Sequence, residues 1–81
     1  MRTFEELADL LRILGDPTRL RLLANLNQGE LSVSEITQVT GFSQPRVSRH
    51  LKLLCESHVL RRTRDQNEVY YRVTINEDRR G

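Results

Sequence analysis

Apolar side chains recur with helical spacing in a segment that begins at Ser43. Val47, Leu51 and Leu54 follow one another at i, i+4 and i+7, which places them on one face of a helix. Ser43 suits the N-cap because its hydroxyl can accept a hydrogen bond from a first-turn N–H. Pro45 is tolerated in that turn because first-turn amides have no intrahelical partners. The segment predicts a helix with a buried apolar face and a polar outer face.

Three shorter helices are predicted upstream of this segment. Each follows a residue that can cap a helix, namely Thr3, Asp16 or Ser32. Thr3 and Ser32 are also followed three residues later by glutamate, which is the capping-box pattern. The expected helices cover residues 4–14, 17–26 and 33–40.

The last two helices are separated by a very short connection. Gly41 is expected at the end of one helix, and only Phe42 lies between it and the next N-cap at Ser43. Two short helices joined in this way are typical of a helix-turn-helix. The apolar spacing predicts inward-facing residues at Leu20, Leu23 and Leu26 in the second helix and at Val33, Ile36 and Val39 in the third.

The first helix has more apolar surface than one core requires. Its apolar arc of about 200° is wider than the stripe of an ordinary surface helix. Phe4, Leu7, Ala8, Leu11 and Leu14 form one stripe, which we expect to pack on the chain's own core, while Leu10 and Ile13 project to the side. The excess surface predicts a homodimer interface that draws on Phe4, Leu7, Leu10, Leu11 and Ile13.

After the fourth helix the spacing changes from helical to alternating. Residues 59–64 and 68–74 read as two strands around the turn-prone Asp65-Gln66-Asn67. The predicted fold is mainly α with a small β-hairpin: a winged helix-turn-helix of four helices followed by a two-stranded wing. We expect this domain over residues 1–75 and a flexible tail over 76–81.

The basic residues are distributed unevenly along the chain. The net charge is +2, but residues 1–42 hold four Arg against six Asp or Glu. Residues 43–72, in contrast, hold six Arg and one Lys against three Asp or Glu. A basic half that contains the polar-faced helix predicted after Ser43 is the electrostatic pattern of a nucleic-acid-binding domain.

Several other classes of protein fit the composition poorly. The single Cys55 excludes an internal disulfide and a Cys-x-x-Cys metal cluster. No run approaches the roughly 20 apolar residues of a membrane span, and we expect no signal peptide and a soluble cytoplasmic protein. Without a glycine-rich phosphate loop or an arranged nucleophile, we expect no enzymatic activity and no cofactor.

Four motifs occur in order along the chain and point to one family. They read L-G-D-P-T-R-L-R-L-L at 14–23, E-L-S-V-S-E-I at 30–36, S-Q-P-R-V-S-R-H-L-K-L-L at 43–54 and V-Y-Y-R-V at 69–73. Together they resemble the ArsR-like winged helix-turn-helix repressors over residues 4–74. The resemblance implies a homodimer that binds double-stranded DNA and releases it when an effector, which the sequence does not identify, binds.

The resemblance also implies which residues meet DNA. The groove-reading surface would include Ser43, Gln44, Arg46, Ser48, Arg49 and His50. Helical spacing adds Lys52, and strand alternation adds Arg62 and Arg64, which share one face of the hairpin. For His50, either a structural hydrogen bond or a phosphate contact is expected rather than catalysis.

The sequence departs from the family's metal-sensing members. Those members carry cysteines in the segment that corresponds to residues 32–36. This chain has Ser32 and Ser34 there, and a hydroxyl is a poor ligand for soft metals. Cys55 and His58 supply two ligands where zinc needs three or four. We therefore expect no metal site.

The expected function is that of a sequence-specific DNA-binding transcriptional regulator, acting as a repressor. Many family members continue past the wing into a further helix, whereas this chain ends seven residues after Thr74. One alternative is therefore the N-terminal DNA-binding module of a longer protein, such as a methyltransferase fusion. The other is a protein-interaction winged helix, which acidic or apolar residues in place of Arg46, Arg49 and Lys52 would favour.

Overall fold

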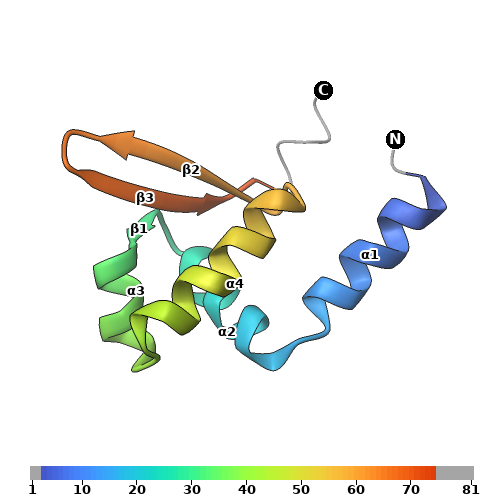
Figure 1. Ribbon diagram of the computed structural model, residues 1–81, viewed down its shortest axis with the longest axis horizontal. Coiled ribbons are helices and arrows are strands. Elements are labelled where there is room, and N and C mark those ends of the chain that lie inside the picture. Colours follow the sequence, from blue (N-terminus) through green and yellow to red (C-terminus); the bar gives the residue numbers. More distant parts are fainter. Residues whose placement is uncertain (1–2, 75–81) are drawn as a thin grey trace.

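Four helices and three strands make up residues 3–74, the part of the chain that the computed structural model describes. In chain order these are α1 (Phe4–Leu14), α2 (Pro17–Leu26), β1 (Leu31–Ser32), α3 (Val33–Thr40), α4 (Gln44–Glu56), β2 (Leu60–Asp65) and β3 (Glu68–Val73). Figure 1 shows α4 crossing the middle of the molecule, with the β2–β3 wing and α3 on one side and α1 on the other side. The fold is a winged helix-turn-helix; the predicted tail, 76–81, lies outside the described residues.

The helices begin where the capping residues predicted. Thr3 and Glu6 exchange side-chain-to-backbone hydrogen bonds of 2.8 and 3.1 Å, and Ser32 and Glu35 do the same at 2.8 and 3.2 Å. The Asp16 carboxylate accepts from the first-turn amides of α2 at 2.8 and 3.2 Å. These contacts span at most three residues, so the local sequence is enough to specify them.

The wing contains one strand more than predicted. β3 lies between β2 and β1, and both of its neighbours are antiparallel to it. Leu31 pairs with Tyr71 and Ser32 with Tyr70, at positions where the sequence analysis predicted no strand. Ser32 has the extended backbone of an N-cap, with φ −83° and ψ 167°, and this geometry also suits pairing with a strand edge.

One apolar core joins the helices to the base of the wing. It consists of Ile13, Leu22, Leu26, Ile36, Val47, Leu51, Leu54, Val59 and Leu60. The predicted inward positions Leu20 and Val39 were wrong, because these side chains are 50% and 59% exposed while Leu22 is fully buried. Helical spacing allowed either choice in leucine-rich α2, and only the packing of α2 into the common core selects Leu22 and Leu26.

The predicted orientation of α1 was also wrong. Ile13 is only 8% exposed and belongs to the chain's own core, against which Leu10 packs. Phe4 and Leu11, which were expected to face that core, are 81% and 69% exposed. The wide apolar arc offered two possible inward faces, and the packing buries the side that carries Ile13. The excess apolar surface therefore lies along Phe4, Leu7 and Leu11.

Candidate nucleic-acid interface

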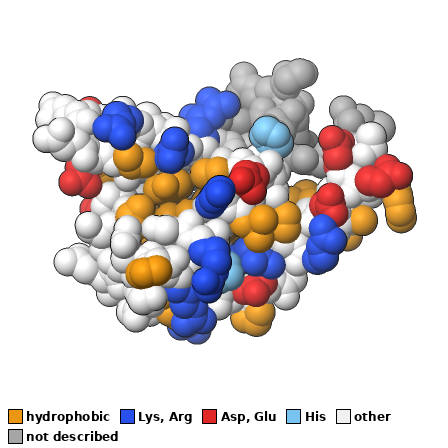
Figure 2. Space-filling model, viewed as in Figure 1, with side chains coloured by type: hydrophobic (Ala, Val, Ile, Leu, Met, Phe, Trp, Pro, Cys, Tyr) orange, Lys and Arg blue, Asp and Glu red, His pale blue; other side chains and the backbone are white. Residues whose placement is uncertain are grey.

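The side of α4 that faces away from the core is exposed and basic. Its apolar stripe of Val47, Leu51 and Leu54 is fully buried, which fixes the rotation of the helix about its axis. Arg49 and Lys52 are exposed as a result, and neither has a hydrogen bond or ion pair with another described residue. Figure 2 shows basic side chains gathered over this helix and the wing. This surface is free to meet a polyanion.

The first turn of α4 combines a cap with a polar pair. The Ser43 hydroxyl accepts from the backbone N–H of Arg46 at 3.4 Å, so this side chain serves as the N-cap. The Gln44 amide donates to the Ser48 hydroxyl at 3.4 Å, one turn further on. Ser43 is therefore occupied by capping, whereas Gln44 and Ser48 form a polar pair beside the exposed basic face.

Arg46 is held against the neighbouring helix and turn. Its guanidinium donates to the Thr18 hydroxyl at 2.9 Å and stacks over the Phe42 ring at 4.1 Å from the ring centroid. Thr18 lies in α2, and Phe42 lies in the turn that joins α3 to α4. A guanidinium has five N–H donors, so a hydrogen bond to Thr18 leaves others for a phosphate. The structure thus orients Arg46 as well as exposing it.

A groove separates α4 from the wing. Arg62 lies opposite Tyr71 in the strand register, and Arg64 lies opposite Val69, which places both arginines on one face of the hairpin. The residues that line the groove are Ser48, Lys52, Cys55, Glu56, Arg62 and Tyr71. Lys52 and Arg62 therefore supply positive charge from the two sides of the groove.

Cys55 is part of this groove and is half-buried. Burial raises the pKa of its thiol, and the positive charge of Arg62 opposes that rise only in part. The thiol is thus held in its protonated, weakly nucleophilic form at neutral pH.

His50 turns toward α2 and not toward the exposed face. Its Nδ1 lies 3.4 Å from Nη1 of Arg19, and burial lowers its pKa from the usual value of 6.5. Of the two roles expected for His50, the structure supports the structural hydrogen bond.

Arg19 was missed as a candidate residue, although it stands within the D-P-T-R motif. Two signals were available: its i,i+3 spacing from Asp16, and the predicted end of the first helix at Leu14, which leaves the carbonyl of Ile13 without an intrahelical donor. In the structure Arg19 Nε donates to that carbonyl at 2.6 Å.

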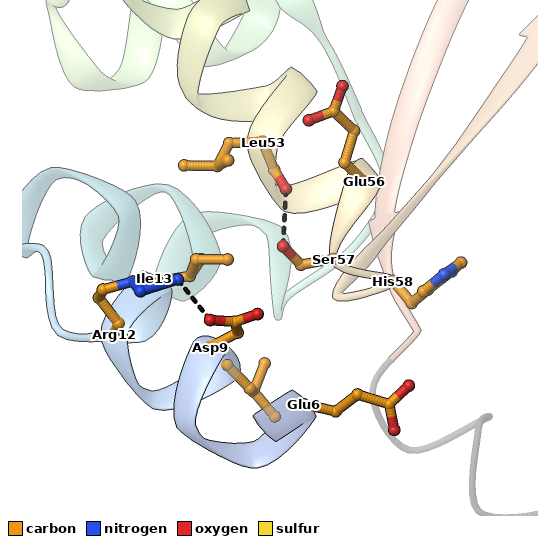
Figure 3. A pocket seen from close by; sticks show the side chains of 9 residues that line it. Glu6, Asp9, Arg12, Ile13, Leu53, Glu56, Ser57 and His58 are labelled. Atoms are coloured by element: carbon orange, nitrogen blue, oxygen red, sulfur yellow. Dashed lines mark hydrogen bonds and ion pairs between the residues drawn. The ribbon is translucent and has the colours of Figure 1, made fainter. Parts of the chain in front are cut away.

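A second pocket lies between α1 and the end of α4. Unlike the groove beside the wing, it is lined by several acidic side chains. Glu6, Asp9 and Glu56 line it together with His58, and Figure 3 shows Glu6 and Glu56 pointing to different sides of it. Within residues 3–74, no three His, Cys, Asp or Glu side chains are grouped to hold a metal ion. No helix in that range is long and apolar enough to cross a membrane.

Comparisons of the sequence with known proteins identify related repressors. Residues 16–60 match the family described as "Bacterial regulatory protein, arsR family". The biofilm growth-associated repressor of Xylella fastidiosa is 41% identical over 69 residues, which cover 85% of this chain and 60% of that protein. The arsenical resistance operon repressor of Staphylococcus aureus is 34% identical over 71 residues, which cover 88% of this chain and 68% of that protein.

Solved structures give the same fold. The transcriptional repressor BigR from Xylella fastidiosa matches with a TM-score of 0.82 at 38% identity, covering 90% of this chain and 74% of that one. A homodimeric winged helix-turn-helix DNA-binding domain from Mycobacterium bovis matches with a TM-score of 0.84 at 28% identity, covering 94% and 70%. The chain spans about 60% of the length of the biofilm growth-associated repressor. On these grounds, the chain belongs to the arsR family of bacterial regulatory proteins.

Proposed function

We propose that this chain is the sequence-specific DNA-binding domain of a transcriptional repressor, with α4 inserted in the major groove. The observation that carries this proposal is the exposed basic face of α4, on which Arg49 and Lys52 have no hydrogen-bond or ion-pair partner among the described residues. Arginine can pair with guanine in the major groove, and lysine can neutralise phosphate. Such a regulator acts without catalysing a reaction, in the cytoplasm, where bacterial DNA lies.

The wing and α4 have different roles in this proposal. Gln44, Ser48 and Arg49 address base edges from α4, because they lie on or beside its exposed face. Arg62 and Arg64 contact the phosphate backbone from the wing, since they share the hairpin face that borders the groove. Phosphate contacts position the protein on the duplex, whereas base contacts supply the sequence preference.

The regulator is proposed to act as a homodimer joined through α1. Phe4, Leu7 and Leu11 form an exposed apolar stripe, and large apolar stripes on a helix are normally covered by another surface. The related domain from Mycobacterium bovis is homodimeric. Two-fold pairing lets two α4 helices enter successive major grooves about 34 Å apart.

The decisive experiment selects duplexes from a random-sequence pool with the wild-type chain and then measures their affinity for variants. We expect the double variant Arg49→Glu, Lys52→Glu to lose binding to the selected duplexes. Arg21→Glu is the matched control, because Arg21 is an exposed arginine on α2 and should matter little. Failure of the wild type to enrich any duplex would favour the protein-interaction module instead.

A further inference from the structure

The side chain of Arg19 connects three helices. From the first turn of α2, its Nε donates to the carbonyl of Ile13 in the last turn of α1 at 2.6 Å. Its Nη1 lies 3.4 Å from Nδ1 of His50 in α4, and its Nη2 lies 3.9 Å from the Asp16 carboxylate. The side chain is only 15% exposed. We call these four groups the Arg19 clamp: the Arg19 guanidinium, the Ile13 carbonyl, the Asp16 carboxylate and the His50 imidazole.

Each contact in the clamp has a chemical reason. The carbonyl of Ile13 lies in the last turn of α1, which ends at Leu14, and carbonyls in the last turn of a helix have no intrahelical donor. Arg19 supplies the missing donor. A guanidinium can only donate, so Nδ1 of His50 must accept, and the imidazole is then neutral with its proton on Nε2.

A proton on His50 would break this arrangement. Protonation of Nδ1 removes the hydrogen-bond acceptor and places a positive imidazolium next to the positive guanidinium of Arg19. Burial is the main cause that lowers the pKa of His50 below 6.5. The charged groups that act on it are the Asp16 carboxylate, which raises the pKa, and the guanidinium groups of Arg19, Arg49 and Arg46, which lower it.

We propose that Arg19 is a positioning residue for DNA recognition, which holds α4 against the end of α1 through neutral His50, and that a proton on His50 loosens α4. The proposal rests on the proposed function, since it concerns the helix that would read DNA. It also links the helix proposed for dimerisation to the helix proposed for recognition. A loosened α4 should bind DNA more weakly in acid. A histidine that contacted phosphate would behave in the opposite way, because its positive charge would strengthen binding.

The test measures the affinity of the chain for a selected duplex between about pH 5 and 8, so that the acid end lies well below the usual histidine pKa of 6.5, because burial lowers the pKa of His50. We expect the wild type to bind several-fold more weakly at the acid end. His50→Asn places a side-chain oxygen near the position of Nδ1 and does not titrate, so its affinity should not vary with pH. His58→Asn is the matched control: this exposed histidine lies outside the clamp, and its variant should keep the wild-type pH dependence.

Two Arg19 variants complete the test. Arg19→Gln should bind several-fold more weakly at neutral pH and lose most of the pH dependence, and Arg19→Lys should recover part of the affinity. Thermal unfolding at each pH verifies that every protein compared is folded. Wild-type affinity that rises or stays constant in acid, or a His50→Asn variant that keeps the wild-type slope, would overturn the proposal.

The proposal and the proposed function can fail separately. Binding of the wild type to no duplex at neutral pH contradicts the proposed function alone. The clamp is then followed without DNA, by NMR of the backbone amides of α1 and α4 during titration of His50. Amides at the end of α1 should shift with those of α4 in the wild type and not in Arg19→Gln. A titration that leaves the α1 amides unmoved would overturn the clamp.

Discussion

At the scale of single residues, sequence preference is expected to depend most on Arg49. This side chain stands on the exposed face of α4 without a hydrogen-bond partner in the described part of the chain. A bidentate contact to a base should contribute about 1–3 kcal/mol on the preferred site and much less on random DNA. Arg49→Ala should therefore reduce the ratio of specific to random affinity, measured by fluorescence anisotropy with both duplexes.

The control for this prediction is Arg21→Ala, which removes an exposed arginine from α2 and leaves α4 intact. An equal loss of affinity on both duplexes would identify Arg49 as a phosphate contact, and the assignment of base recognition to it would be wrong.

At the scale of the elements, the wing should add affinity with little sequence preference. Arg62 borders the groove and Arg64 lies on the same face of the hairpin, so replacing both with alanine should remove two phosphate contacts. The slope of log affinity against log salt should become shallower by about 0.9 for each phosphate that the protein no longer neutralises. Arg61→Ala is the matched control because Arg61 lies in the same strand on the opposite face. An unchanged slope in the double variant would indicate that the wing does not meet the duplex.

A second prediction at this scale concerns metal binding and capping at the start of α3. Here the Ser32 hydroxyl and the Glu35 carboxylate already form a capping box, and Ser32 is buried. Zinc, cadmium or arsenite at stoichiometric concentration should therefore leave DNA affinity unchanged, because hydroxyl groups bind such metals poorly. Ser32→Ala should instead lower the free energy of unfolding by about 1 kcal/mol, as removal of an N-cap does. A metal-specific loss of binding that disappears in Glu35→Ala would contradict this interpretation.

At the scale of the whole molecule, the exposed stripe of α1 should hold two copies together. Leu7→Glu combined with Leu11→Glu places charges on this stripe without entering the core, since both leucines are exposed. Sedimentation should detect a folded monomer, and operator affinity should fall sharply because only one half-site is then held. Leu20→Glu, at an exposed leucine of α2, should remain dimeric. A dimer that survives the double substitution would show that the interface lies elsewhere.

Much of this fold could be predicted from short-range patterns. The caps at Thr3, Asp16, Ser32 and Ser43 were all confirmed, because each joins groups no more than three residues apart. The buried stripe of α4 was also confirmed, since a single narrow row of apolar residues leaves only one face to bury. That row in turn predicted which basic residues of α4 would be exposed, and so the candidate site.

The sequence by itself therefore determined where the helices begin, the helix-turn-helix and the basic face of α4. Only the tertiary structure decided which side of α1 packs inward, because an apolar arc this wide offers two faces of similar composition. The pairing of Leu31 and Ser32 with β3 is also decided only by the tertiary structure. The same holds for the contact between Arg19 and His50, which are 31 positions apart in the sequence. Contacts at such separations depend on how the helices pack, and local spacing does not encode that packing.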